Sequence, residues 1–309
     1  SGYEDVVVLM NFKRVQKYVR WVGGIIIDEA HNAVIPRLVT IPRRALEQLL
    51  DKHGIEDIDV RNAELVRAIL SELLLTIAME ANELVGLDDV VAFTESQVTY
   101  YDAAEDALVG VKVEGLPENL RGKRTVIMSA TLPPSLLQSQ FPVIKVPQRQ
   151  AILARVGDIP VTVEGIERFG EQIIKRLKDL ISTGPTLIFS TSGKEVIIDD
   201  VVYEDELEPS HLCKRTVMLR FFGKYAEGVR LNCYRKIVLL TLPLLPHTVL
   251  RRLETRGIRI NDIIILKTVQ AIGRAMPQDP PPEVVLLDRR FKAYCHYLQE
   301  YGIQCVDAG

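Results

Sequence analysis

The chain has 309 residues, a hydrophobic content of 47% and a formal net charge of −3. This length suffices for two domains of ordinary size, and the hydrophobic content suffices for their cores. The 16 Pro and 19 Gly are ordinary usage, which excludes a fibrous or disordered chain. The charge excludes a protein that coats nucleic acid by bulk positive charge, and no apolar run reaches the roughly 18 residues of a membrane span.

The chain begins with Ser-Gly-Tyr-Glu-Asp, without an initiator Met or the basic and then apolar stretch of a secretory signal. We therefore expect a processed product or a segment of a longer intracellular protein, from the cytoplasm, nucleoid or nucleus. The four cysteines are Cys213, Cys233, Cys295 and Cys305. None forms a Cys-x-x-Cys pair, so we expect reduced thiols and no zinc or iron–sulfur site within this chain.

Short β-branched runs alternate with amphipathic stretches, a pattern that favours parallel sheets covered by helices. In the first half of the chain, residues 5–10, 24–27 and 125–128 are predicted strands. The run 24–27 is fully apolar, so we expect it to be a central strand.

Between the second and third of these strands, residues 41–87 are predicted to form a helical insert. Pro42 suits the first turn of one helix, and Asn62 suits the N-cap of a longer one. Four apolar residues share one face of that longer helix: Leu65, Ile69, Leu73 and Ile77. Residues 98–101 and 108–113 alternate as strands do.

We expect the domain joint near residues 147–160, where Pro, Gly and polar residues interrupt the periodicity. An amphipathic helix should follow and end at Gly184 and Pro185. Its apolar face would comprise Ile166, Phe169, Ile173, Leu177 and Leu180. Strands of a second sheet are predicted at 186–190, 236–242 and 283–287.

The strongest chemical signal is the box Asp28-Glu29-Ala30-His31, which directly follows the apolar run 24–27. Open α/β sheets bind ligands at the carboxyl ends of their strands. Asp28 would hold Mg²⁺ directly or through water, and Glu29 would orient the attacking water in phosphoryl transfer. His31 would relay the nucleotide state to the other domain. The alternative is a strand that ends in a charged turn.

A second signal, Ser129-Ala130-Thr131, also follows a predicted strand. Its hydroxyl groups could hydrogen-bond the acidic box and couple the two domains. Taken alone, this segment favours a helix cap before Pro133.

A third signal is Gln270-Ala-Ile-Gly273-Arg274. Arg274 would approach the γ-phosphate as an arginine finger, and Gly273 would let the backbone pack closely. The alternative is a helix with a surface Arg that is stopped by Pro277. The order of the three signals makes coincidence improbable.

Together these segments resemble the XPD/DinG family of superfamily 2 DNA helicases. Residues 27–32 resemble motif II, 129–132 motif III and 270–275 motif VI. Other segments are also similar to the family: 184–190 to the first strand of its second motor domain, 222–228 to motif V, 242–246 to the following proline-rich turn, and 287–291 to the segment after motif VI.

The resemblance implies an α/β fold with two RecA-like parallel-sheet motor domains, the first incomplete. The domains would span 1–147 and 148–309, with the insert 41–87 as a small arch. ATP and Mg²⁺ would bind between the domains, and single-stranded or forked duplex DNA would run across both. Gln270 would join Arg274 in the catalytic set. The second domain's nucleotide and DNA contacts would come from Gly223, Lys224, Glu227, Gly228 and Gly273.

The chain also departs from the family. It contains no Gly-x-x-x-x-Gly-Lys-Ser/Thr loop to cradle the phosphates. Pro277 replaces the second Arg of motif VI, and Ala226 and Arg230 replace the usual Ser and Asp of motif V. The family carries its phosphate loop and iron–sulfur domain upstream. We therefore expect both in an N-terminal segment, on another chain or outside these residues, and a cluster only if that segment exists.

Two functions from different classes remain. The first is an ATP-dependent DNA helicase that translocates on single-stranded DNA, although this chain alone would not hydrolyse ATP. The second is a catalytically inactive, helicase-derived nucleic-acid-binding or scaffold protein. RNA as the track is a weaker third reading, because such motors contact the backbone more than the bases.

Secondary candidates favour ordinary structural roles. The basic clusters at 121–124 and 251–259 could contact phosphates, but a solvated surface is the favoured reading. Phe93, Tyr100 and Tyr101 could stack bases, but core of the insert is favoured. Metal ligation by His211, Cys213, Cys295 and His296 is set aside because their spacing is irregular.

Overall fold

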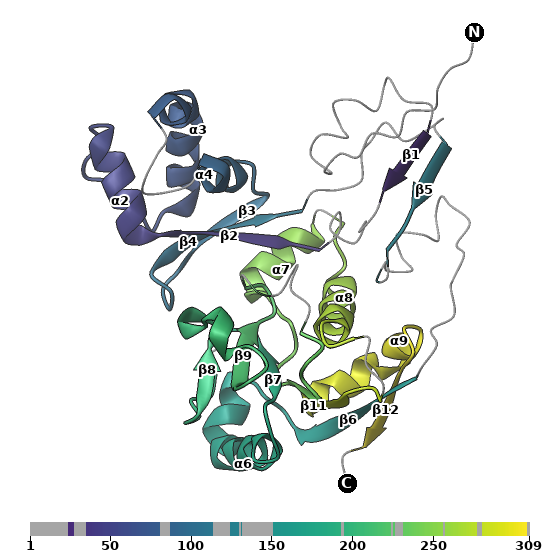
Figure 1. The fold of residues 1–309 in the computed structure, drawn as a ribbon. Coiled ribbons are helices and arrows are strands. Elements are labelled where there is room, and N and C mark those ends of the chain that lie inside the picture. The colour runs from purple at the N-terminus through teal and green to yellow at the C-terminus, as the bar shows by residue number, and fades with distance from the viewer. Residues whose placement is uncertain are drawn as a thin grey trace.

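The computed structural model describes residues 24–27, 35–80, 87–113, 124–129, 131, 151–192, 195–223, 225, 231–255, 257–276 and 280–307. Within these residues the fold is α/β, with seven α-helices, a seven-stranded parallel sheet, a three-stranded antiparallel sheet and a two-stranded parallel pair (Figure 1). None of the described helices combines the length and apolar character that crossing a bilayer requires. The predicted strand 5–10 lies outside the described residues.

The seven-stranded sheet confirms the predicted second sheet. Its strands, in spatial order, are β12 (Ile303–Asp307), β6 (Ile152–Ile159), β11 (Glu283–Asp288), β10 (Lys236–Leu239), β7 (Leu187–Ser190), β9 (Thr216–Arg220) and β8 (Val201–Tyr203). All neighbouring strands are parallel. The predicted strands 186–190, 236–242 and 283–287 correspond to β7, β10 and β11, although β10 ends at Leu239.

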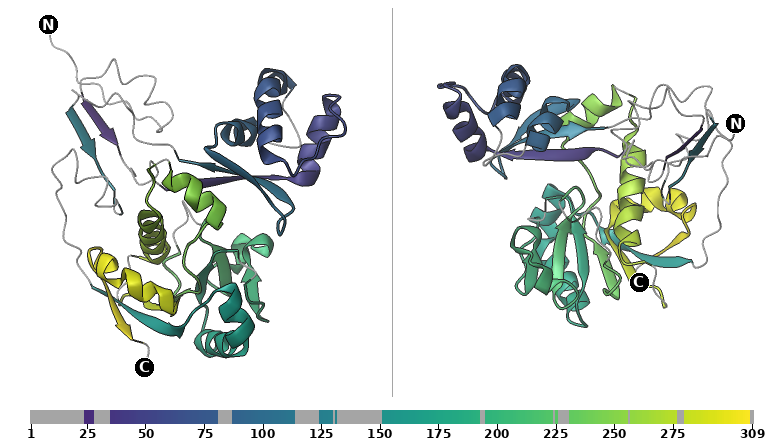
Figure 2. Two further views of the ribbon diagram at one scale, coloured as in Figure 1. Left: turned by 180° about the vertical axis from the view of Figure 1, so that it is seen from behind. Right: turned by 45° about the horizontal axis from the view of Figure 1, so that its top comes forward.

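Helices cover both faces of this sheet (Figures 1 and 2). On one face lies α6 (Val163–Ile181), whose Ile173 and Leu177 are fully buried against the strands. On the other lie α8 (Ile260–Gly273) and α9 (Cys295–Gln299). The predicted amphipathic helix is therefore confirmed as α6, with Thr162 at its N-cap. Burial on both faces accounts for the continuous apolar runs of the central strands.

Four strands of the sheet were not recognised as such in the sequence. Residues 152–159 form β6, although the sequence predicted an interrupted joint near 147–160. Its residues alternate between buried and exposed because β6 lies near the sheet edge, and Gly157 and Pro160 read as breakers. The short strands β8, β9 and β12 also lie toward the edges. The domain boundary itself stays a prediction.

The predicted helical insert 41–87 lies within a larger body, the insert, which comprises the described residues between 35 and 113 and contains a sheet as well as helices. Its helices are α2 (Arg43–Lys52), α3 (Ala63–Glu80) and α4 (Leu87–Thr94), and its antiparallel strands are β2 (Arg37–Pro42), β4 (Ala107–Lys112) and β3 (Val98–Asp102) in spatial order. The two predicted strands are confirmed as β3 and β4. Asn62 caps α3, because its Oδ1 accepts a hydrogen bond from Leu65 N at 3.2 Å. Pro42 ends β2 and precedes α2 instead of lying in its first turn.

The insert packs against the rest of the protein through α7 (His247–Glu254), as both views in Figure 2 agree. Helices α2 to α4 cover one face of the three-stranded sheet, and α7 covers the other. Two ion pairs join the same bodies: Arg252 to Glu64 and Arg220 to Glu105, each at 3.4 Å. The fully buried strand β4 is therefore enclosed on both faces.

Strands β1 (Gly24–Ile27) and β5 (Arg124–Ile127) pair in parallel, apart from the seven-stranded sheet. They confirm the predicted strands 24–27 and 125–128, the second with a shift of one residue. The central position expected for β1 is not found among the described residues, because β1 has one described neighbour and Ile26 is 66% exposed. Its apolar sequence therefore does not correspond to burial on both faces here.

All four cysteines are in disulfide bonds, Cys213 with Cys233 and Cys295 with Cys305. The expectation of reduced thiols is therefore wrong. Partners lie 20 and 10 residues apart in the chain, a spacing without a recognisable motif. Folding brings their Cα atoms to 5.5 and 5.8 Å, within the range that a disulfide spans.

Candidate functional site

The predicted acidic box follows β1, and the predicted coupling segment follows β5. Because these strands are parallel and Ile27 aligns with Ile127, the carboxyl ends of the two strands lie at the same end of the pair. Several predicted site residues lie outside the described residues: Asp28, Glu29, His31, Ala130, Lys224, Glu227 and Gly228. The strand ends that precede the first two motifs are thus side by side.

In the coupling segment, Ser129 Oγ accepts a hydrogen bond from Thr131 N at 3.2 Å. This local contact spans two residues, as in a turn. Thr131 is buried, whereas Ser129 is half-buried. The hydroxyl groups of Ser129 and Thr131 therefore lie close to the end of β5.

Gln270, Gly273 and Arg274 lie at the end of α8. Gln270 is buried, and its Oε1 accepts no hydrogen bond from any described residue. An added Cβ at Gly273 would meet no atom within 4 Å, so the close packing expected there is not found in the described part. Gln270 and Arg274, four residues apart, share one side of the helix end.

A backbone hydrogen bond joins the chain just after the motif V-like segment 222–228 to the motif VI-like segment 270–275. Leu231 N donates to the carbonyl oxygen of Arg274 at 2.8 Å. Leu231 lies three positions after the segment 222–228, and Arg274 is the C-cap of α8. This hydrogen bond therefore joins residues that lie 43 positions apart in the chain.

A second contact lies close to these segments, because Phe222 begins segment 222–228 and Lys267 precedes segment 270–275 by three positions. Lys267 of α8 is 3% exposed, and its Nζ lies 5.1 Å from the ring centroid of Phe222. A cation over an aromatic face is attracted by the ring quadrupole, more strongly when water is excluded. Lys267 was not singled out in the sequence, because one lysine in an apolar run carries no motif.

Gly223 follows β9 and packs against a carboxylate. An added Cβ would overlap both carboxylate oxygens of Glu204, a residue of the short 3₁₀ turn after β8. The sequence drew attention to Gly223 through its motif but not to Glu204. Only spatial proximity identifies the acid, since the two lie 19 positions apart, from 204 to 223.

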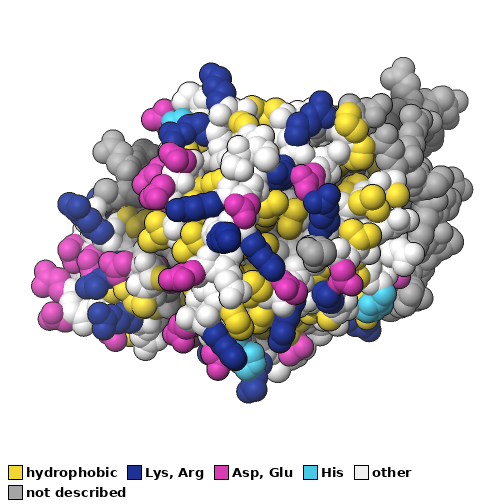
Figure 3. All heavy atoms as spheres, turned by 90° about the horizontal axis from the view of Figure 1, so that it is seen from below, with side chains coloured by type: hydrophobic (Ala, Val, Ile, Leu, Met, Phe, Trp, Pro, Cys, Tyr) yellow, Lys and Arg dark blue, Asp and Glu magenta, His cyan; other side chains and the backbone are white. Residues whose placement is uncertain are grey.

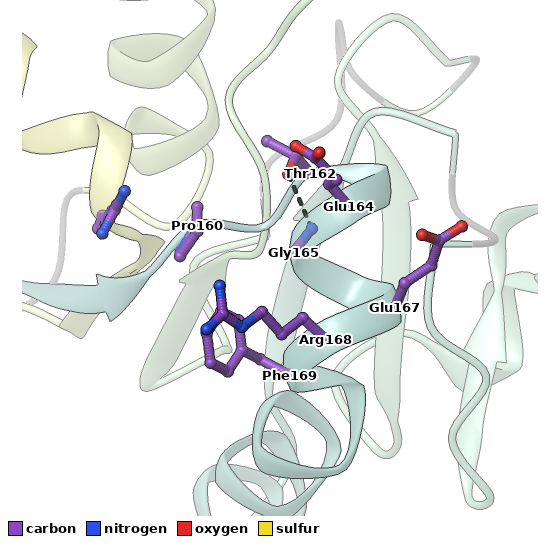
Figure 4. A pocket seen from close by; sticks show the side chains of 8 residues that line it. Pro160, Thr162, Glu164, Gly165, Glu167, Arg168 and Phe169 are labelled. Carbon is purple, nitrogen blue, oxygen red and sulfur yellow. Dashed lines mark hydrogen bonds between the residues drawn. The ribbon is translucent and has the colours of Figure 1, made fainter.

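A cavity of about 570 Å³ lies elsewhere, where β6 and β11 lead into the following helices (Figure 4). Thr162 Oγ1 accepts from Gly165 N at 3.0 Å there, and the Arg168 guanidinium lies 5.2 Å from the Phe169 ring. Arg168 and Glu167 extend to opposite sides of α6. No predicted site residue lines this cavity.

Two of the secondary aromatic candidates are packed in apolar cores, and residues 121–123 of one basic cluster lie outside the described residues. Phe93 is fully buried in the insert core, and Tyr100 packs between the insert and α7. Burial raises the pKa of the Tyr100 hydroxyl above its ordinary value. On the face in Figure 3, basic and acidic side chains are interspersed rather than gathered into one basic surface. Among the described residues, no group of three or more His, Cys, Asp or Glu could hold a metal ion.

Comparisons with family models and with curated proteins gave no match for this chain. The functional argument therefore depends on the sequence motifs and on the geometry described above. The hydrogen bond between Leu231 and Arg274 carries the most weight, because it places the chain just after segment 222–228 beside segment 270–275.

Proposed function

We propose that this chain is part of an ATP-dependent DNA helicase of the XPD/DinG type. The observation that supports this most is the hydrogen bond between Leu231 and Arg274, which brings the residue three positions after the motif V-like segment 222–228 to the motif VI-like segment 270–275. The parallel sheet covered by helices on both faces is compatible with a RecA-like motor domain. The pair β1 and β5, with the acidic box after β1, would belong to a first motor domain.

In this proposal Arg274 stabilises charge on the transferred phosphate, and Asp28 and Glu29 supply the metal ligand and the water-orienting base. Mg²⁺ would neutralise phosphate charge when bound. One described group fits a nucleotide: the Gln270 carbonyl oxygen is buried without a hydrogen-bond partner among the described residues. A hydroxyl or water of a bound ligand would satisfy this acceptor.

The helicase is proposed to act inside the cell on single-stranded or forked duplex DNA. Disulfides persist mainly in oxidising compartments, so an intracellular location requires that both bonds resist the cellular reductants. The 309 residues contain no phosphate loop, so hydrolysis is proposed for an assembly that includes one.

The test is an ATPase assay with single-stranded DNA, with and without a polypeptide that supplies a phosphate loop. We expect turnover only with that polypeptide, abolished by Glu29→Gln and lowered by at least about 10³-fold by Arg274→Lys. Arg176→Gln is the control, because Arg176 pairs on the surface with Asp158. The absence of turnover under every condition would contradict the helicase proposal.

A nucleic-acid-binding or scaffold protein without hydrolysis is the second candidate. The missing phosphate loop and the residues Pro277 and Arg230 favour it. It predicts DNA binding that persists in Glu29→Gln and no turnover with the supplied loop. Turnover by the isolated chain that Glu29→Gln abolishes would contradict this candidate.

A further inference from the structure

Glu204 is a buried carboxylate in an otherwise exposed acidic turn. The turn Glu204–Glu206 follows β8, and its other two acids, Asp205 and Glu206, are exposed. Glu204 is 7% exposed. A charged group is costly to bury unless it is paired and hydrogen-bonded, so its partners show what it holds in place.

The two carboxylate oxygens bind the two ends of one turn of the neighbouring connection. Oε2 accepts from Arg220 N at 2.7 Å, and Oε1 accepts from Tyr225 N at 3.2 Å. The Arg220 side chain adds an ion pair, with Nε at 3.6 Å from Oε2. Hydrogen bonds from backbone N–H groups to an ionised acceptor are among the stronger ones in proteins.

Gly223 lies between these two anchor points. A side chain at this position would overlap the carboxylate of Glu204, so the turn wraps closely around the acid. Gly223 N also donates to the carbonyl oxygen of Arg220 at 3.1 Å. The carboxylate therefore determines the shape of the turn that carries a predicted binding residue.

The connection between β8 and β9, which begins with Glu204, also anchors the end of the connection between β9 and β10. Cys213 is bonded to Cys233, and Cys213 N donates to the Tyr234 hydroxyl at 2.9 Å. The Tyr234 hydroxyl donates to the carbonyl oxygen of Arg215 at 3.1 Å. Residues on both sides of 226–230 are thus attached to one neighbouring connection, with Glu204 as the anchor at the start.

We propose that Glu204 is a positioning residue, which holds the turn carrying Gly223 in the shape that binds a phosphate-bearing ligand. This inference rests on the proposed function, in which the motif V-like segment contacts nucleotide and DNA. Glu204 acts through the amides of Arg220 and Tyr225 and does not touch the ligand. Its negative charge alone would repel phosphates, so its contribution to binding has to come from geometry.

The test is the affinity of the full 309-residue chain for a fluorescent single-stranded oligonucleotide, measured by anisotropy. We expect Glu204→Gln to weaken binding about tenfold, the size of one lost hydrogen bond to a charged group. Glu206→Gln is the matched control, because it removes the same charge from the same turn at an exposed position. It should leave the affinity within about twofold.

Two further measurements separate positioning from general stability. Hydrogen exchange at the amides of Arg220 and Tyr225 should become faster in Glu204→Gln. Leu177→Ala creates a cavity under the opposite face of the sheet. It should lower the melting temperature without weakening DNA binding. If Glu204→Gln does not fold, Glu204→Asp keeps the charge but shortens the reach, and should weaken binding in the same direction.

If the wild type binds DNA and Glu204→Gln binds it equally well, the positioning role alone is overturned. The same holds if Glu204→Gln weakens binding no more than Leu177→Ala does. Unchanged exchange at Arg220 and Tyr225 would overturn it as well. A wild-type chain that binds neither DNA nor nucleotide would overturn the proposed function and this inference together.

Discussion

At the residue scale, close approaches between the backbone and its neighbours decide which side chains the chain tolerates. Gly165 lies in the first turn of α6, where an added Cβ would overlap the carbonyl oxygen of Pro160. Gly170 lies one and a half turns further along the same helix, and the nearest atom to its Cβ position is 3.9 Å away. The same substitution should therefore have opposite effects at the two positions.

We predict that Gly165→Ala lowers the free energy of unfolding by about 1–3 kcal/mol, because the backbone must shift to relieve the overlap. Gly170→Ala should raise it by about 0.5–1 kcal/mol, because Ala loses less conformational entropy in a helix than Gly does. Urea denaturation of the two variants and the wild type measures both changes. Equal effects at both positions would contradict the steric argument.

Tyr234 is a second residue whose environment has a measurable consequence. It is 1% exposed, and burial raises the pKa of its hydroxyl, although the hydrogen bond from Cys213 N opposes the rise. The neutral hydroxyl donates to Arg215 O, which the phenolate could not do. A pKa raised by folding favours the protonated form in the folded state.

From this shift we predict a loss of stability at alkaline pH. Stability is fully present below the unfolded pKa of about 10 and falls as the pH rises through the folded pKa. Tyr234→Phe should cost about 1–3 kcal/mol at pH 7, because Cys213 N loses its acceptor. The free energy of unfolding of Tyr234→Phe should also fall less steeply than that of the wild type between about pH 10 and 11, because the variant lacks the titrating hydroxyl of Tyr234. Urea denaturation across this range tests both expectations.

At the element scale, the two disulfides attach loops to neighbouring elements. Cys213 lies before β9 and Cys233 lies between β9 and β10, and both are exposed. Cys295 and Cys305 are half-buried and join α9 to β12. The first bond closes the longer stretch of chain, with separations of 20 and 10 residues.

We predict that replacing either pair by Ser lowers the free energy of unfolding by roughly 3 kcal/mol, slightly more for the longer loop. A dithiol reductant should open Cys213–Cys233 first, because attack on a disulfide needs access to sulfur. Alkylation followed by mass spectrometry measures the order. Modification of Cys295 before Cys213 would contradict this expectation, and the untreated protein should show no reactive thiol.

At the scale of the whole molecule, the insert is attached to the seven-stranded sheet through α7. Leu253 of α7 is fully buried in the core shared with Val98 and Val111 of the insert. The ion pair between Arg252 and Glu64 is exposed and so contributes little to this attachment. Apolar packing therefore determines whether the two bodies unfold together.

We predict that Leu253→Ala costs about 2–5 kcal/mol and speeds hydrogen exchange in β3 and β4. Leu177→Ala creates a similar cavity under the other face of the sheet and should leave exchange in β3 and β4 close to that of the wild type. Exchange measured by mass spectrometry compares the two variants. Slow exchange in β3 and β4 of Leu253→Ala would indicate that the insert folds independently of α7.

The α/β class, the strands β7, β10 and β11, and the helix α6 could all be predicted from local sequence patterns. These elements were predictable because a buried parallel strand is a continuous apolar run and a packed helix repeats every 3.6 residues. Both signals are local. The cap at Asn62 was predictable for the same reason, since a cap needs only its own helix.

Tertiary structure alone decided the features that depend on distant residues. Of the edge strands, β8 is buried but has only three residues, and β12 is largely exposed, so neither carries a long apolar run. The disulfide partners, the hydrogen bond from Leu231 to Arg274, and the role of Glu204 each need two segments to meet in space. Sequence spacing does not reveal such contacts, because neighbouring strands of the sheet come from distant parts of the chain.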